Sequence, residues 1–170
     1  MPKQRSFLSE SLDNWRDVRR GLIAEVENIR ATKFDYRPVP EVRSVRELVQ
    51  HILEVAMMMT GELTQPGHHF HGASYAKLLE EHAGAAYDAT TKKELLALLE
   101  SQMNDAAERF EAAGEEAIMQ PIRNFDGSYW TRMQWLHHGI QHEMYHRGQL
   151  CTYERLMGLT PALTKMIHGG

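Results

Sequence analysis

Apolar residues recur at three- and four-residue steps along four long stretches of the chain, with charged residues between them. This spacing places the apolar side chains on one face of a helix, so each stretch is predicted to be an amphipathic helix. The expected long helices cover residues 6–30, 44–64, 92–114 and 131–157. No stretch shows the two-residue alternation of a strand, and the pattern therefore predicts an all-α fold, a four-helix bundle.

The starts of three of these helices carry a local signal. A Ser or Thr followed three residues later by Glu or Gln is the pattern of a capping box, in which the two side chains bond to each other's backbone N–H groups. The chain has this pattern at Ser44–Glu47, Thr91–Glu94 and Thr131–Gln134. At the other end of the last helix, Gly158 suits the C-terminal cap position.

The connectors between the helices differ in character. Residues 34–40 hold two prolines and are expected to form a packed, non-helical link. Residues 74–83 are predicted to form a short helix and residues 84–90 a plain connector. Residues 120–130, before the last helix, are expected to be irregular, as a small hairpin or a loop over one end of the bundle. The tail to residue 170 is expected to be loosely held.

Composition narrows the class of protein. A length of 170 residues with 42% hydrophobic residues suits one soluble domain spanning residues 1–170. The net charge of −4 and the lack of a basic stripe argue against nucleic-acid binding. No apolar run is long enough to span a bilayer, and Met1–Glu10 has no signal-peptide core, so a cytoplasmic protein is expected. The single cysteine, Cys151, excludes an intrachain disulfide and a cysteine zinc cluster, and its position suggests a buried structural role.

Histidines carry the main chemical signal. His138, His142 and His146 follow one another at four-residue steps, which places them on one face of the last helix. Helical pairs of this spacing hold metal ions. His51 lies on the apolar face of the second helix, where a buried imidazole needs a partner. Together, His51, His142 and His146 would form a three-nitrogen site for zinc, nickel, copper or iron(II).

Several neighbouring residues are alternative hydrogen-bond partners for the imidazoles. Glu54, Glu143, Gln149 and Tyr145 are candidates to bond the outer ring nitrogens, although charge alone favours a solvated position for Glu143 and Arg147. A di-metal carboxylate site is disfavoured because only one Glu-x-x-His copy is present. The loop with His68, His69 and His71 is a weaker metal candidate because flanking glycines leave it flexible.

Three features occur together in this chain: the run His142-x-x-x-His146-Arg147-Gly148-Gln149, His51 in a helix that opens Ser44-x-x-Glu47-Leu48, and Tyr36-Arg37-Pro38 before that helix. In these features the chain resembles the DinB/YfiT-like superfamily. The resemblance spans nearly the whole chain. It implies a four-helix bundle with a divalent metal held by three histidines, which by position are His51, His142 and His146. His138 lies one turn earlier and is at most a pocket residue.

The resemblance also implies dimers, and thiol-dependent transferases or isomerases that use small thiols such as bacillithiol, mycothiol or glutathione. The leading hypothesis is therefore a metal-dependent enzyme that transfers a low-molecular-weight thiol to an electrophile, as a homodimer. A metal-dependent hydrolase, with Glu54 or Glu143 as the base, is the near alternative. A non-catalytic, metal-stabilised stress-response or dimerisation module, and a helical interaction protein with incidental histidines, are the other hypotheses.

Overall fold

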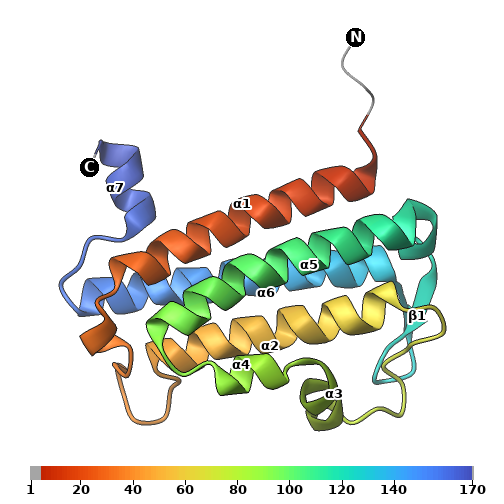
Figure 1. The fold of residues 1–170 in the computed structure, drawn as a ribbon, viewed down its shortest axis with the longest axis horizontal. Coiled ribbons are helices and arrows are strands. Elements are labelled where there is room, and N and C mark those ends of the chain that lie inside the picture. The colour runs from red at the N-terminus through yellow and green to blue at the C-terminus, as the bar shows by residue number, and fades with distance from the viewer. Residues whose placement is uncertain (1–4, 170) are drawn as a thin grey trace.

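Four long helices lie side by side and form the body of the protein (Figure 1). The structure is a computed structural model that describes residues 5–169. Residues 1–4 of the N-terminal stretch considered above, and residue 170, lie outside the described residues. The long helices are α1 (Phe7–Asn28), α2 (Val45–Thr64), α5 (Lys92–Ile118) and α6 (Arg132–Leu156). The all-α four-helix bundle predicted from the hydrophobic pattern is confirmed.

The smaller elements lie at the ends and along one side of the bundle (Figure 1). After α1 comes a single 3₁₀ turn, η1 (Ala31–Lys33), and after α2 come two short helices, α3 (Tyr75–His82) and α4 (Gly84–Asp88). Strands β1 (Pro121–Arg123) and β2 (Tyr129–Thr131) pair antiparallel as a hairpin before α6, with Ile122 opposite Trp130. The C-terminal helix α7 (Ala162–His168) follows α6.

The connection through α3 and α4 determines the topology of the bundle. It carries the chain back along α2, so that α2 and α5 run in the same direction and α1 and α6 run in the opposite one (Figure 1). Helices α2 and α1 each pack against both α5 and α6. The interface between α2 and α6 is therefore an inner seam of the bundle, and residues from both helices can meet there.

Two of the three predicted capping boxes are complete, and the third, at Thr131 and Gln134, forms only its Thr131 half. Ser44 and Glu47 form a reciprocal capping box at the start of α2, and Thr91 and Glu94 form another at the start of α5. Thr131 accepts a hydrogen bond from the backbone N–H of Gln134 at the start of α6. Each cap satisfies a backbone donor that the first helical turn leaves free, which fixes where the helix begins.

The structure corrects three local expectations. The stretch expected to be a plain connector after α3 contains the single turn of α4. The third long helix does reach Gly114, where φ is +80° and the helical conformation breaks, but one further turn continues to Ile118. The tail is not loose, because α7 packs against α1.

No helix among residues 5–169 combines the length and apolar character needed to cross a membrane.

The core consists of two apolar clusters with a polar layer between them on α1, α5 and α6. Arg19 is only 1% exposed, and its guanidinium donates to the Glu143 carboxylate, the Leu99 carbonyl and the Gln102 amide oxygen. Trp15 also donates to Glu143, at 2.9 Å. Every strong donor in this layer has an acceptor, as buried polar groups require.

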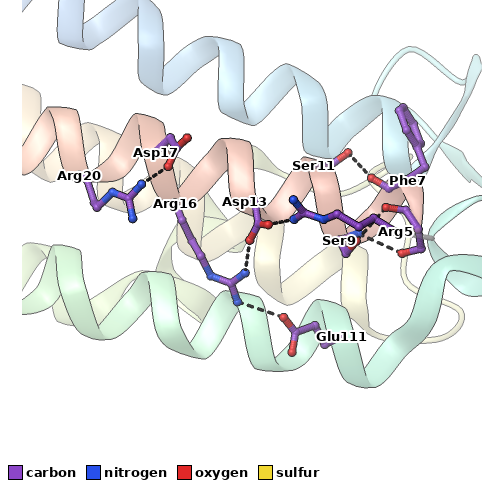
Figure 2. Close-up of polar contacts among 10 residues, drawn as sticks. Arg5, Phe7, Ser9, Ser11, Asp13, Arg16, Asp17, Arg20 and Glu111 are labelled. Atoms are coloured by element: carbon purple, nitrogen blue, oxygen red, sulfur yellow. Dashed lines mark hydrogen bonds and ion pairs between the residues drawn. The ribbon is translucent and has the colours of Figure 1, made fainter. Parts of the chain in front are cut away.

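The surface of α1 carries ion pairs of a different kind. Figure 2 shows Arg16 between Asp13 on its own helix and Glu111 on α5, at 2.9 and 3.0 Å. Arg20 pairs with Asp17 one turn along α1. These side chains are exposed to solvent, where such pairs add little to stability.

Candidate metal centre

The imidazoles of His51, His142 and His146 meet at the seam between α2 and α6. Nε2 of His142 lies 3.2 Å from Nε2 of His51 and 3.0 Å from Nε2 of His146. One ring nitrogen from each of the three residues lies within 4.8 Å of the other two. Sequence spacing alone placed the pair on α6, and the fold brings His51 to it from a segment 91 positions away.

These distances fit a shared metal ion. Two nitrogens that each lie about 2.1 Å from one ion, at angles of roughly 90–109°, are separated by about 3.0–3.4 Å. The Nε2–Nε2 separations of 3.0 and 3.2 Å lie in that range. Three protein ligands also leave further coordination positions for small molecules, as in catalytic rather than structural zinc sites.

The protonation states favour metal binding as well. Burial lowers the pKa of His142 to about 3, and repulsion from His146 and His51 acts in the same direction. Burial also lowers the pKa of His146, against the opposing effect of its hydrogen bond to Gln149. Both rings are therefore neutral near pH 7, and a neutral imidazole is the form that binds a metal.

Gln149 orients one of the rings. Its Oε1 lies 2.6 Å from Nδ1 of His146, and because an amide oxygen only accepts, Nδ1 carries the proton. The lone pair of His146 Nε2 then points into the cluster. Gln149 Nε2 in turn donates to the Tyr145 hydroxyl at 3.4 Å. This is the outer-nitrogen partner that metal-binding histidines usually have, and it agrees with the candidates named from the sequence.

Glu54 occupies the corresponding position beside His51. Its Oε2 lies 3.6 Å from His51 Nδ1, and both side chains are largely buried. Burial, and after it the nearby Glu54 carboxylate, raise the pKa of the Tyr87 phenol on α4. Glu54 is thus the carboxylate that faces the histidine cluster from α2.

Two sequence-based interpretations at the site are wrong. Glu143 and Arg147 were expected on the solvated face, but Glu143 is 2% exposed and bound to Arg19. The Arg147 side chain is 12% exposed and points across α1 toward Glu25. Its guanidinium occupies the space that a Cβ on Gly21 would need, which explains a glycine in the middle of α1. Neither Glu143 nor Arg147 is paired with a ring of the cluster.

The other histidines lie outside the cluster. His138 is exposed and packs edge-on against Trp130 and Trp135, at centroid distances of 5.9 and 5.4 Å. In the loop after α2, Nδ1 of His68 lies 3.2 Å from buried Glu62, which also contacts His82. The loop histidines do not form a group of three metal ligands within residues 5–169.

Cys151 is half-buried and lies near Glu25 and Glu154 at the end of the bundle that carries α7. Burial and the two carboxylates raise the pKa of its thiol to about 11, so the thiol stays protonated and unreactive. Glu25 accepts hydrogen bonds from the backbone N–H groups of Ala162 and Leu163 and so holds α7. The packing of α7 therefore explains why Glu25, Cys151 and Glu154 lie close together.

A cavity of about 460 Å³ opens onto His51. Its walls come from the segment before α2, from α2 itself and from α4, and they include Arg37, Arg43, Glu54 and Tyr87. A larger cavity of about 1030 Å³ lies between the end of α2 and the hairpin, and none of the three histidines lines it. Sequence reasoning missed Arg43 and Tyr87, because nothing in their spacing connects them to His51 before the chain is folded.

Solved structures with the same fold agree with this architecture. A DinB-like protein from Bacillus subtilis is 22% identical and matches 89% of this chain and 93% of its own, with a TM-score of 0.66. YfiT from Bacillus subtilis, described as a probable metal-dependent hydrolase with an unusual four-helix bundle topology, is 15% identical over 94% of both chains, with a TM-score of 0.70.

A mycothiol-dependent maleylpyruvate isomerase is 14% identical, with a TM-score of 0.67. The match covers 84% of this chain but only 60% of the isomerase, which is a longer protein. No curated protein matches the chain. A sequence model of the DinB superfamily matches residues 14–150, which include His51, His142 and His146. The chain therefore belongs to the DinB superfamily.

Proposed function

We propose that the protein is a metal-dependent enzyme in which His51, His142 and His146 hold a divalent ion and a low-molecular-weight thiol is transferred to an electrophile. The observation that carries the proposal is the convergence of three imidazoles at 3.0 and 3.2 Å beside a cavity that a small molecule can enter. A divalent ion held by these residues would lower the pKa of a thiol or water that reached an open coordination position.

The chain's own residues prepare the site for this chemistry. Gln149 fixes the His146 ring, and the low pKa values keep His142 and His146 unprotonated, so that few protons compete with the ion. The protein supplies no thiol of its own near the cluster, since Cys151 lies by Glu25 and its pKa is raised. A thiol nucleophile must therefore come from a small molecule.

Metal-dependent hydrolysis is the second candidate, and Glu54 favours it. The carboxylate lies beside His51 and lines the cavity, where it can accept a proton from an attacking water. YfiT, which has a similar fold, is described as a probable metal-dependent hydrolase, which supports the same interpretation. The two candidates share the metal site and differ in the nucleophile.

Product analysis distinguishes them. Metal-loaded protein is incubated with a chromogenic electrophile or ester, with and without glutathione or another small thiol, and the products are identified by mass spectrometry. The transferase proposal predicts a thioether product that forms only with protein, metal and thiol together, and that is lost in His142→Ala. Turnover that yields the hydrolysed product without thiol would replace the transferase with the hydrolase.

A further inference from the structure

Arg43 is a cation without a partner at the mouth of the proposed metal site. It comes directly before Ser44, the N-cap of α2, and it lines the same cavity as His51. Its side chain is exposed, and its guanidinium makes no hydrogen bond or ion pair with any residue between 5 and 169. Its backbone carbonyl accepts a hydrogen bond from Tyr153, which anchors the main chain there independently of the side chain.

The other arginine that lines this cavity, Arg37, already has an ion-pair partner. Arg37 Nη2 donates to both carboxylate oxygens of Glu47, at 3.1 and 3.0 Å. Glu47 also accepts from the backbone N–H of Ser44 at 2.6 Å, as the second half of the capping box. Arg37 and Glu47 therefore balance each other, and Arg43 is left as the free positive charge of the cavity wall.

Arg43 lines the same cavity as His51, and His51 joins the histidine cluster through its 3.2 Å approach to His142 on α6. A divalent ion held at the cluster would add two positive charges to that of Arg43. The opposing carboxylates are Glu54, which faces His51 and Tyr87, and Glu41, which is exposed at the rim. The space between the cluster and Arg43 is thus electropositive when the metal is bound.

We propose that Arg43 selects a substrate that bears a carboxylate, which it binds while the reacting group of the same molecule reaches the metal centre. This inference rests on the proposed function. A guanidinium presents paired donors that match a carboxylate and form strong, charge-assisted hydrogen bonds. The cavity of about 460 Å³ has the size of a small-molecule site.

A pair of matched thiols tests the proposal. Cobalt(II)-loaded protein is titrated with 3-mercaptopropionate, which carries a carboxylate, and with 2-mercaptoethanol, which does not, and the cobalt–thiolate absorption band reports binding. The preference for the acid is the ratio of the two dissociation constants. It is measured for wild type, Arg43→Gln, Arg43→Lys and Arg37→Gln, after cobalt content has been determined for each.

We expect Arg43→Gln to lower the preference for the acid by about tenfold, since one charge-assisted contact is lost. Arg43→Lys keeps the charge and should retain part of the preference, and Arg37→Gln should change it much less than Arg43→Gln. Equal preferences in wild type and Arg43→Gln would overturn the proposal, as would equal losses in the two Gln variants. Failure of wild type to bind cobalt would instead refute the metal site and the proposed function with it.

Discussion

The Arg19 guanidinium donates two hydrogen bonds to the Glu143 carboxylate in the middle of the bundle, from Nε to Oε1 at 2.6 Å and from Nη2 to Oε2 at 2.8 Å. Glu143 directly follows His142 on α6. Because neighbouring helix residues point about 100° apart, a side chain bound to α1 at Glu143 leaves the His142 ring facing α2. The buried pair thus fixes the rotation of α6 that turns His142 toward His51.

Replacing Glu143 with Ala is expected to destabilise the protein strongly. It leaves a 1% exposed guanidinium without its carboxylate, and loss of one partner of a buried pair costs about 3–5 kcal/mol. For a chain of this size, that lowers the Tm by roughly 10 °C. Thermal unfolding followed by circular dichroism measures it.

Glu111→Ala is the matched control for that experiment. It also removes a carboxylate from an arginine pair, the exposed one with Arg16 at 3.0 Å (Figure 2). Its cost should stay under about 1 kcal/mol. Similar losses in the two variants would show that the pair with Arg19 has no special structural role.

Gln149→Leu is expected to weaken metal binding while leaving the fold intact. The variant keeps a side chain of similar size but loses the acceptor 2.6 Å from His146 Nδ1. Loss of such an outer partner typically lowers metal affinity by about 10- to 100-fold. Competition with a chromogenic chelator measures the affinity. Gln141→Leu, an exposed change on the same helix, should leave it unchanged, and an equal effect of both changes would count against the orienting role.

Glu154 is expected to make stability depend on pH. Burial and the nearby charge of Glu25 raise its pKa to about 7, so the folded protein keeps a proton that the unfolded chain releases. This contribution is fully present below the unfolded pKa of Glu, near 4.3, and is lost as pH rises through about 7.

The comparison variant is Glu154→Gln, which cannot ionise. As pH rises from 5 to 7.5, the free energy of unfolding of wild type should fall relative to that of the variant, and the difference should level off above pH 7. Urea unfolding at each pH provides both values. A difference that is constant with pH would mean that the Glu154 carboxyl titrates normally.

Most of the fold could be predicted from the sequence because its signals are local. Apolar periodicity and side-chain caps such as Ser44 and Thr91 act within a few residues, so the long helices and their starts were expected. Helix α7 was not, since it is held by distant Glu25 rather than by a pattern of its own. The interpretation of Glu143 failed for the same reason: its charge suggested solvent, but its partner Arg19 lies 124 positions away.

The metal centre was predictable in part. The spacing of His142 and His146 placed them on one helical face. The place of His51 on the apolar face of the second helix, and then the resemblance to the DinB/YfiT-like proteins, indicated it as the third residue. The cavity wall formed by Arg43 and Tyr87 depends on how the segment before α2 and helix α4 fold back over His51, which no local pattern records.

The metal content of wild type and His142→Ala tests the three-histidine site most directly. Both proteins are purified without an affinity tag, incubated with one divalent metal and dialysed. Inductively coupled plasma mass spectrometry gives the stoichiometry. We expect about one ion per wild-type chain, since one cluster of three imidazoles is proposed to hold it. The variant should lose most of that ion and keep the helical circular dichroism spectrum. Equal metal content in the two folded proteins, or none in wild type, would contradict the three-histidine site.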